Sequence, residues 1–342
     1  MKDIPKIFLV GVTDSYEFLK REFEWKVINF DKRSIDWSSE TKIVLAFDFA
    51  NIEKAMCIIL EFPEHQFILI LLGNETQQLK ILRQLARIER VLAIYSQYDP
   101  QPLIFGGMKT SLIQLIDSPR TFFNFNFFMI CLRGAYRGLK SIVFARIPKI
   151  KHFPLGYSNR FIEELLLSGL ISIESMTIMQ LSNSFSNRSR KSEVIFKGQL
   201  TGQYRKLIAP YLMQKELVKF ELNQQWGRPE LLTSTSYVKS MIESKFVFCP
   251  PGHVSNDTFR RTEALICGAL PIETESSPQN WQKCYTSFAD TQLNRYSVVR
   301  SVREALKMPE TDRHRIRVFL LNKMIGEIVE VTKNIENQMT SA

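Results

Sequence analysis

The stretch FCPPGHVSNDTFRRTEALICGALPI, residues 248–272, decides the fold of this chain. Its apolar start stops at the Pro-Pro-Gly of residues 250–252, and a polar turn follows. A helical segment then runs to Gly268, after which an apolar run resumes. The pattern predicts a strand, a loop, a helix and a second strand. A loop that joins a buried strand to the amino end of a helix is where α/β proteins bind anionic ligands.

The same alternation of short apolar runs and helical segments continues in both directions from this stretch. The runs contain few polar residues, which is typical of strands buried on both faces of a parallel sheet. They cover residues 6–12, 26–30, 42–49, 67–73, 91–96, 193–199, 217–222 and 245–252. The sequence therefore predicts an α/β fold with two doubly wound, Rossmann-like domains that face each other across a cleft.

Residues 147–161 interrupt the alternation, because two prolines and a glycine punctuate them. We interpret this segment as the linker between the two domains. The end of the chain has helical spacing and predicts a long helix capped by Thr311 or Asp312. The expected parts are a first domain at residues 1–155, a second at 156–311 and a C-terminal helix at 312–342.

Composition and charge narrow the class of protein. The chain has 342 residues and a formal net charge of +10, which favours an anionic partner. Signatures of helix-turn-helix, zinc-finger and RNA-recognition modules are missing, so nucleic acid is not the expected partner. The five cysteines show no C-x-x-C spacing, which is typical of free thiols in a reducing compartment. The sequence has no signal-peptide pattern and no apolar run of ~18 residues, and we expect a cytoplasmic protein.

The helix of the opening stretch carries the residues that could do chemistry. Arg260 and Arg261 lie in its first turns, where the helix dipole disfavours positive charge. An anion between them and the free backbone N–H groups would explain this, since arginine binds phosphate through two parallel hydrogen bonds. Glu263 shares the face of Arg260, and a carboxylate there could accept hydrogen bonds from a ribose diol. The alternative is a plain Arg–Glu pair on the surface.

The opening stretch also resembles a known family. The strings S-K-F-x-F-x-P-x-G at 244–252 and D-T-x-R-x-x-E-A-L-x-x-G-A-L-P-I at 257–272 are similar to the donor-site signature of exostosin-like glycosyltransferases. Three weaker likenesses lie in the matching order. They are LILLGNE at 69–75, FPLGY at 153–157 and FKGQLTGQYRKL at 196–207.

This resemblance implies the two-lobed glycosyltransferase architecture called GT-B, with the acceptor on the N-terminal domain and the donor on the C-terminal one. It implies transfer of a sugar from a nucleoside-diphosphate sugar to a hydroxyl of a glycan or lipid-linked glycan. Retaining enzymes of this architecture often carry a glutamate where this chain has Ser255, so inversion is favoured. By position, Glu263 would bind the ribose and Arg260 the diphosphate. The further donor-site residues implied are Gly198, Arg205 and Gly252.

The remaining site residues are assigned with alternatives. Inversion needs a general base, for which Glu75 is the first candidate and Asp14 the second. Either acid could instead be a helix cap or first-turn residue. His253 could touch phosphate or sugar, or could be a loop histidine without a role. The chain has no Asp-x-Asp pair, so we expect no metal and no cofactor, with arginines neutralising the diphosphate.

Two segments leave a peripheral membrane contact open. The run TFFNFNFFMI, residues 121–130, fits either protein core or a surface for a lipid-linked acceptor. The basic stretch SNRSRKS, residues 186–192, fits either a solvated loop or contact with an anionic lipid or polymer.

Two other functions stay in competition with glycosyl transfer. One is another nucleotide-sugar enzyme, such as an epimerase, which would release sugar from the donor without an acceptor. The other is a non-catalytic module that binds nucleotides or polyanions, which the charge of +10 supports.

Overall fold

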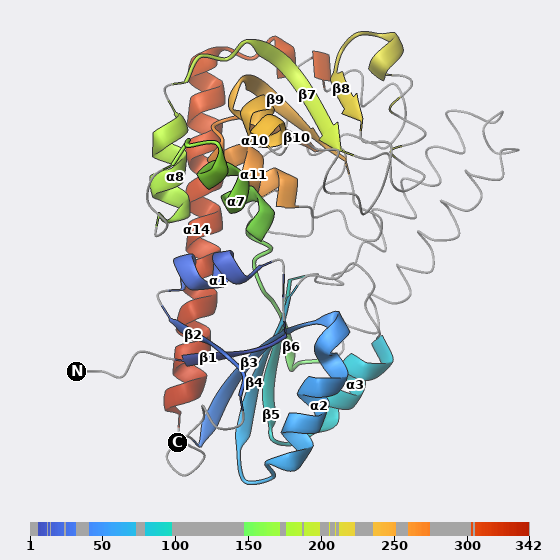
Figure 1. Cartoon of the computed structure of the whole chain (residues 1–342), viewed down its shortest axis with the longest axis vertical. Helices are drawn as coiled ribbons and strands as arrows, with labels where there is room; N and C mark the ends of the chain where they lie inside the picture. The colour runs from blue at the N-terminus through green and yellow to red at the C-terminus, as the bar shows by residue number, and fades with distance from the viewer. Residues whose placement is uncertain are drawn as a thin grey trace, which may run out of the picture. The chain divides into compact units, whose positions relative to one another are not determined.

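The computed structural model describes most of the chain as two parallel β-sheets with helices between their strands (Figure 1). This confirms the predicted α/β class and is compatible with two Rossmann-like domains. The described residues are 6–11, 13, 15–23, 25–31, 41–72, 79–97, 147–171, 176–186, 188–198, 205, 209, 212–222, 235–250, 259–273, 302–303, 305–306 and 307–341.

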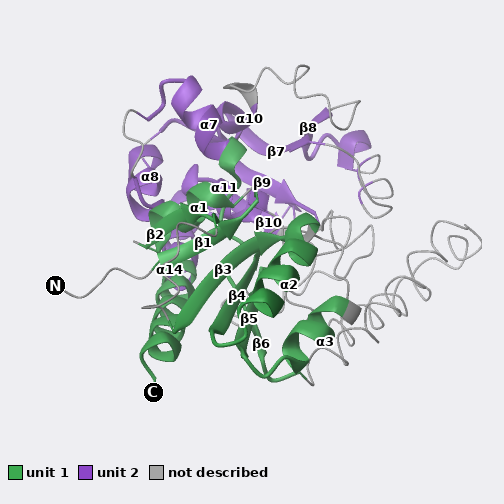
Figure 2. Cartoon of the chain, turned by 60° about the horizontal axis from the view of Figure 1, so that its bottom comes forward, with its two compact units in different colours: residues 1–99, 143–160, 324–342 green, residues 100–142, 161–323 purple. Residues whose placement is uncertain are grey.

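The chain divides into two compact units, coloured separately in Figure 2. Unit 1 comprises residues 1–99, 143–160 and 324–342, and unit 2 comprises residues 100–142 and 161–323. The last helix, α14 (Glu310–Thr340), contributes its first part to unit 2 and its second part to unit 1. The domain boundaries at 155 and 311 remain a prediction.

Unit 1 contains a six-stranded sheet whose strand order is β2-β1-β3-β4-β5-β6, with every neighbouring pair parallel. The strands are β1 (Lys6–Val10), β2 (Lys26–Asn29), β3 (Lys42–Asp48), β4 (Gln66–Leu72), β5 (Val91–Ser96) and β6 (Ile150–His152). The helical elements are α1 (Tyr16–Glu22), the 3-10 turn Phe49–Asn51, α2 (Ile52–Glu61) and α3 (Leu79–Arg87). The first five strands coincide with apolar runs in the sequence.

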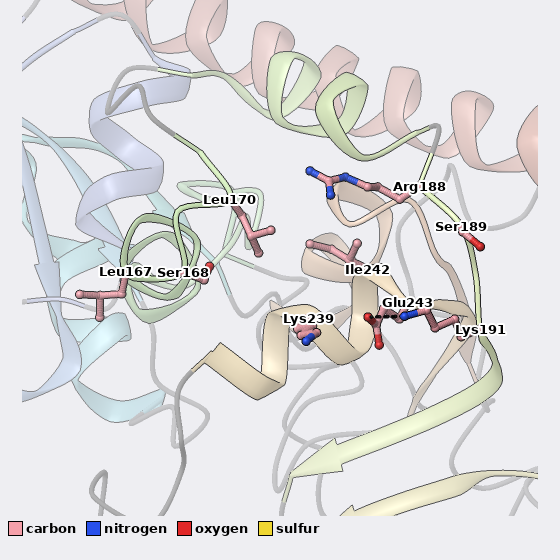
Figure 3. Close-up of a pocket in the computed structure, with 9 residues that line it drawn as sticks. All are labelled: Leu167, Ser168, Leu170, Arg188, Ser189, Lys191, Lys239, Ile242 and Glu243. Atoms are coloured by element: carbon pink, nitrogen blue, oxygen red, sulfur yellow. Dashed lines mark ion pairs between the residues drawn. The ribbon is translucent and has the colours of Figure 1, made fainter.

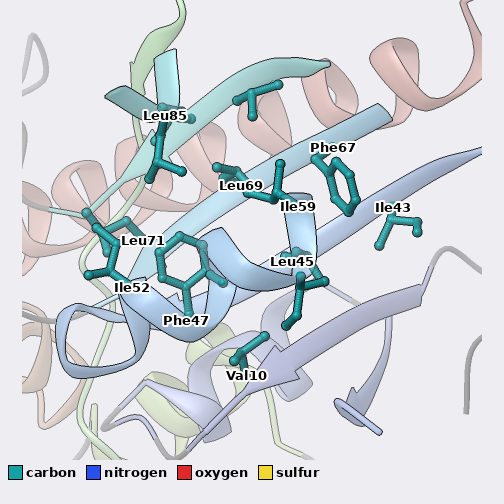
Figure 4. Packing of buried hydrophobic residues seen from close by; sticks show 14 of the residues in the cluster. Val10, Ile43, Leu45, Phe47, Ile52, Ile59, Phe67, Leu69, Leu71 and Leu85 are labelled. Atoms are coloured by element: carbon teal, nitrogen blue, oxygen red, sulfur yellow. The ribbon is translucent and has the colours of Figure 1, made fainter. Parts of the chain in front are cut away.

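The core of unit 1 lies between one face of this sheet and the helices α2 and α3. Alternate residues of the strands, such as Phe47 and Leu69, pack against Ile52 and Ile59 of α2 and Leu85 of α3 (Figure 4). The intervening strand residues are buried as well, since β3 and β4 have almost no exposed position. Burial of both faces explains why these strands are continuous apolar runs rather than alternating ones.

The segment predicted as a linker is not free of regular structure, because its residues 150–152 form strand β6. Tyr95 pairs with Lys151, so the sheet of unit 1 gains a parallel edge strand there. The residues that follow are fixed by side chains: Gln97 Nε2 donates to Leu155 O at 3.0 Å, and Asn159 Nδ2 donates to Thr13 O at 2.7 Å. A strand of three partly exposed residues has no apolar pattern by which the sequence could show it.

Unit 2 contains a four-stranded parallel sheet of order β10-β9-β7-β8. Its strands are β7 (Ser192–Gly198), β8 (Lys219–Leu222), β9 (Ser244–Cys249) and β10 (Leu270–Glu273). Its helices are α8 (Ile178–Phe185), α10 (Thr235–Ile242) and α11 (Phe259–Ile266), and α7 (Asn159–Leu167) enters it from unit 1. The strand, helix and strand predicted for the opening stretch are therefore confirmed as β9, α11 and β10.

Arg190 joins the ends of three helices in unit 2. Its guanidinium donates to Phe185 O and Cys267 O, each at 2.8 Å, and also to Ile242 O. These carbonyls belong to the C-terminal ends of α8, α11 and α10, where backbone acceptors have no intrahelical partner. Burial lowers the pKa of Arg190 to about 10, so the group stays charged at neutral pH. Gly268, at φ +80°, leaves the space that this side chain occupies.

The last helix differs from the prediction at its start. It begins at Glu310, so Thr311 and Asp312 lie in its first turn and neither caps it. The carbonyl of Pro309 accepts the N–H of Arg313 at 3.1 Å, which places the cap one residue before the helix. Its final turns are tied to unit 1, where Lys42 Nζ donates to Gln338 O at 2.9 Å. Among the helices that the structure describes, none combines the length and the apolar run needed to cross a membrane.

Candidate functional site

The candidate site lies at the carboxyl ends of β7 and β9 in unit 2. Strand β7 comes first in the chain, β8 follows on one side of it, and β9 and β10 follow on the other. The chain therefore leaves β7 and β9 in opposite directions, which makes the gap between these strand ends the topological switch point of the sheet. Open α/β sheets bind their ligands at this position.

Two arginines converge on one aromatic ring at this edge. The guanidinium of Arg260, on α11, lies 4.7 Å from the ring centre of Phe196, and that of Arg205 lies 5.9 Å from it. Each arginine also donates to a backbone carbonyl near the end of the other strand. Nη2 of Arg260, which follows β9 in the chain, donates to Lys197 O of β7 at 3.0 Å. Nη2 of Arg205, which follows β7, donates to Pro250 O just after β9 at 3.4 Å. Two cations that follow different strands are thus brought together, as an anion site requires.

Arg260 keeps hydrogen-bonding capacity in this arrangement. Its Nε is buried and has no hydrogen-bond partner among the described residues. The packing of its Nη2 depends on Gly198, which ends β7 at φ +147°. A Cβ at Gly198 would lie 2.6 Å from Arg260 Nη2, so a side chain there would displace the guanidinium. The geometry thus gives a physical reason for glycine at position 198, which the family resemblance implied.

Lys197, which lies between Phe196 and Gly198, forms an ion pair. Lys197 Nζ lies 3.0 Å from Glu221 Oε2 on the neighbouring strand β8, and Lys219 Nζ lies 3.0 Å from Glu221 Oε1. Burial opposes ionisation of Glu221, but the hydrogen bonds from the two lysines outweigh it and lower the pKa of this carboxyl. Lys197 therefore holds β8 beside β7, and Arg205 and Arg260 are the described cations that lie over Phe196 at the switch point.

Glu263 is a buried residue with a specific partner. Its side chain is 2% exposed, and Oε2 accepts a hydrogen bond of 2.7 Å from the hydroxyl of Tyr237 on α10. Burial and the nearby carboxyl of Glu263 raise the pKa of Tyr237 well above 10, so the phenol remains a donor at neutral pH. The alternative prediction, that Arg260 and Glu263 form a simple ion pair on the surface, is therefore wrong, because Glu263 is buried.

Replacing Tyr237 with phenylalanine tests this contact. Tyr237→Phe is expected to lower the free energy of unfolding by about 2 kcal/mol, because the buried carboxyl of Glu263 loses a donor. Urea unfolding followed by circular dichroism measures the loss. Glu263→Ala removes the acceptor, and the double variant Tyr237→Phe/Glu263→Ala completes a cycle. Additive losses in that cycle would show that the two side chains do not interact.

The other predicted site residues lie outside the described residues. These are the two candidate bases Glu75 and Asp14, together with Gly252 and His253. The described ones, Gly198, Arg205 and Arg260, lie together, and Glu263 lies one turn further along α11.

Sequence reasoning missed Phe196 as the ring under the arginines and Tyr237 as the partner of Glu263. Tyr237 lies on α10, which precedes β9 in the chain, and Glu263 lies on α11, which follows β9. No spacing in the sequence connects the two residues.

Comparison with known protein families and with curated proteins finds no significant match for this chain.

Proposed function

We propose that this chain is a glycosyltransferase that moves a sugar from a nucleoside-diphosphate sugar to a hydroxyl of a glycan or lipid-linked glycan. In this proposal the two units are the two lobes of a GT-B architecture, and unit 2 binds the donor. The reaction inverts the anomeric carbon and needs no metal. The sequence resemblance to exostosin-like enzymes suggests the chemistry. The arrangement of Arg205 and Arg260 supports unit 2 as the location of the donor site.

The observation that carries the proposal is the convergence of Arg205 and Arg260 at the switch point of the unit 2 sheet. A diphosphate accumulates negative charge as the bond to the sugar breaks, and fixed cations stabilise that charge in a site shielded from water. Arginine suits the task because its planar fork forms parallel hydrogen bonds to phosphate oxygens. Phe196 beneath both guanidiniums holds them in place through cation–π contact.

The proposed reaction is a single displacement. The acceptor oxygen forms a bond to the anomeric carbon while the bond from that carbon to the diphosphate oxygen breaks. The electron pair of the broken bond stays on the diphosphate, where Arg205 and Arg260 compensate it. The proton of the acceptor hydroxyl passes to a general base, for which Glu75 and Asp14 remain the candidates. A hydrogen-bonded Glu263 in the adjoining turn of α11 would position the ribose.

Thermal unfolding with a panel of nucleotides tests the proposal against its alternatives. One class of nucleoside diphosphate is expected to raise the midpoint of the chain, with or without EDTA, and less so in Glu263→Gln. A ligand at one hundred times its dissociation constant adds about 2.7 kcal/mol of stability. A shift with heparin or RNA but with no nucleotide would replace the enzyme with a polyanion-binding module. Release of free sugar from the donor without an acceptor would indicate an epimerase.

A further inference from the structure

A pocket of about 620 Å³ lies near the amino end of strand β7, whereas the arginine pair lies at the carboxyl end of that strand. Three segments form the pocket: the end of α7, the loop residues just before β7 and the last turn of α10 (Figure 3). Because β7 has seven residues, its two ends lie about 20 Å apart, so this pocket is separate from the proposed donor site. Its volume is in the range of small-molecule sites.

The pocket is lined by an excess of positive charge. Arg188, Lys191 and Lys239 face it, against the single carboxylate of Glu243. Lys191 Nζ lies 3.5 Å from Glu243 Oε1, so these two charges compensate each other. The side chains of Arg188 and Lys239 are exposed and form no ion pair with any residue that the structure describes. Two uncompensated cations from different segments therefore remain at one cavity.

Helix ends at the pocket do not cancel this charge. Both α7 and α10 end there, and the C-terminal carbonyls of a helix carry partial negative charge. At α10 the carbonyl of Ile242 accepts a hydrogen bond from Arg190. At α7 the hydroxyl of Ser168 donates to Glu164 O at 2.6 Å. Both of these carbonyls therefore have donors within the protein, and at α10 the donor is itself a cation.

One wall of the pocket is apolar. Leu167, Leu170 and Ile242 line it, and Leu167 exposes 75% of its surface, more than the other exposed large apolar side chains described. Figure 3 shows Leu170 between Leu167 and the side chain of Arg188, with Ile242 below Arg188 in this view. An exposed leucine beside unpaired cations is matched by a ligand with an anionic head and an apolar tail.

We propose that this pocket binds a phosphate monoester that carries an alkyl chain. Arg188 and Lys239 bind the phosphate oxygens, and the chain covers Leu167 and Leu170. This assigns a role to part of the basic stretch 186–192, which the proposed transfer reaction does not use. The proposal does not depend on glycosyl transfer, because no pocket residue belongs to the arginine site.

Calorimetric titration with octyl phosphate and with inorganic phosphate tests the assignment. The wild-type chain is expected to bind octyl phosphate at least about tenfold more tightly than inorganic phosphate, since burial of apolar surface adds to the ionic contacts. The variant Arg188→Gln/Lys239→Gln is expected to weaken both by about tenfold or more. Leu167→Asn is expected to remove the preference for octyl phosphate and to leave the affinity for inorganic phosphate unchanged.

Matched variants make the test decisive. Lys215→Gln/Arg303→Gln removes one exposed lysine and one exposed arginine of unit 2 away from the pocket, and should bind as the wild type does. Equal weakening in both double variants, or wild-type binding of neither phosphate, would overturn the proposal. Arg260→Ala should keep the preference for octyl phosphate over inorganic phosphate, which separates this site from the donor site. Sedimentation with phosphatidylcholine vesicles, with or without phosphatidic acid, then distinguishes a lipid headgroup from a soluble ester as the source.

Discussion

Replacing Arg190 with methionine is expected to destabilise unit 2 by about 4 kcal/mol. The guanidinium donates to three carbonyls at the ends of α8, α10 and α11, and methionine fills similar space without a donor. A buried carbonyl that loses its partner costs ~1–3 kcal/mol. Ile242 O and Cys267 O lose the donor supplied by Arg190, whereas Phe185 O keeps the N–H of Arg188. Hydrogen exchange read by mass spectrometry should show faster exchange in peptides from α8, α10 and α11.

The control for this prediction lies two residues away. Arg188 belongs to the same basic stretch but is exposed, so Arg188→Met should leave exchange in the three helices unchanged. Arg190→Lys keeps the charge but loses the planar fork, and should fall between wild type and methionine because one ammonium cannot reach all three carbonyls equally. Equal protection of the helices in Arg190→Met and Arg188→Met would contradict a structural role for Arg190.

Much of the fold could be predicted from the sequence, because it rests on parallel strands that are buried on both faces. Strands β3 and β4 are apolar almost throughout, and no register or partner is needed to identify them. Strand β6 was missed because it has three residues and is half exposed, and its pairing with β5 is set by the position of the chain in space. Local pattern thus identified the central strands and the edge strands β2 and β8, and failed only at the three-residue strand β6 among the strands of the unit 1 sheet.

The residues of the candidate site were partly accessible in the same way. Arg260 and Glu263 stand out because they occupy the start of a helix that follows a buried strand. For residues 186–192, in contrast, the sequence indicated only a concentration of positive charge and did not distinguish the roles of the individual cations. In the structure Arg190 is turned inward against three helix ends, Lys191 pairs with Glu243, and Arg188 is exposed. Which cation turns inward depends on where the ends of α8, α10 and α11 meet, and this is not a property of the segment.

Replacing Arg260 with alanine is expected to lower the rate of sugar transfer by a factor of about 10² to 10³. This is the usual effect of removing one group that stabilises charge in a transition state. Arg205 follows a different strand and remains over Phe196, so part of the stabilisation survives. The double variant Arg205→Ala/Arg260→Ala should therefore be slower than either single variant. The rate is measured as release of nucleoside diphosphate from the donor that the thermal screen identifies.

The variants that separate charge from geometry make this prediction specific to the switch point. Arg260→Lys keeps the charge but cannot both donate to Lys197 O and present a fork to phosphate, so it should recover only a small part of the rate. Arg303→Ala removes an exposed arginine elsewhere in unit 2 and should transfer at the wild-type rate. The loss of the contact with Phe196 costs about 1 kcal/mol of stability, so each assay is run below the unfolding midpoint. If Arg260→Ala kept both the wild-type rate and the wild-type affinity for the nucleotide, the diphosphate would bind elsewhere. The convergence of Arg205 and Arg260 would then serve packing around Phe196 alone.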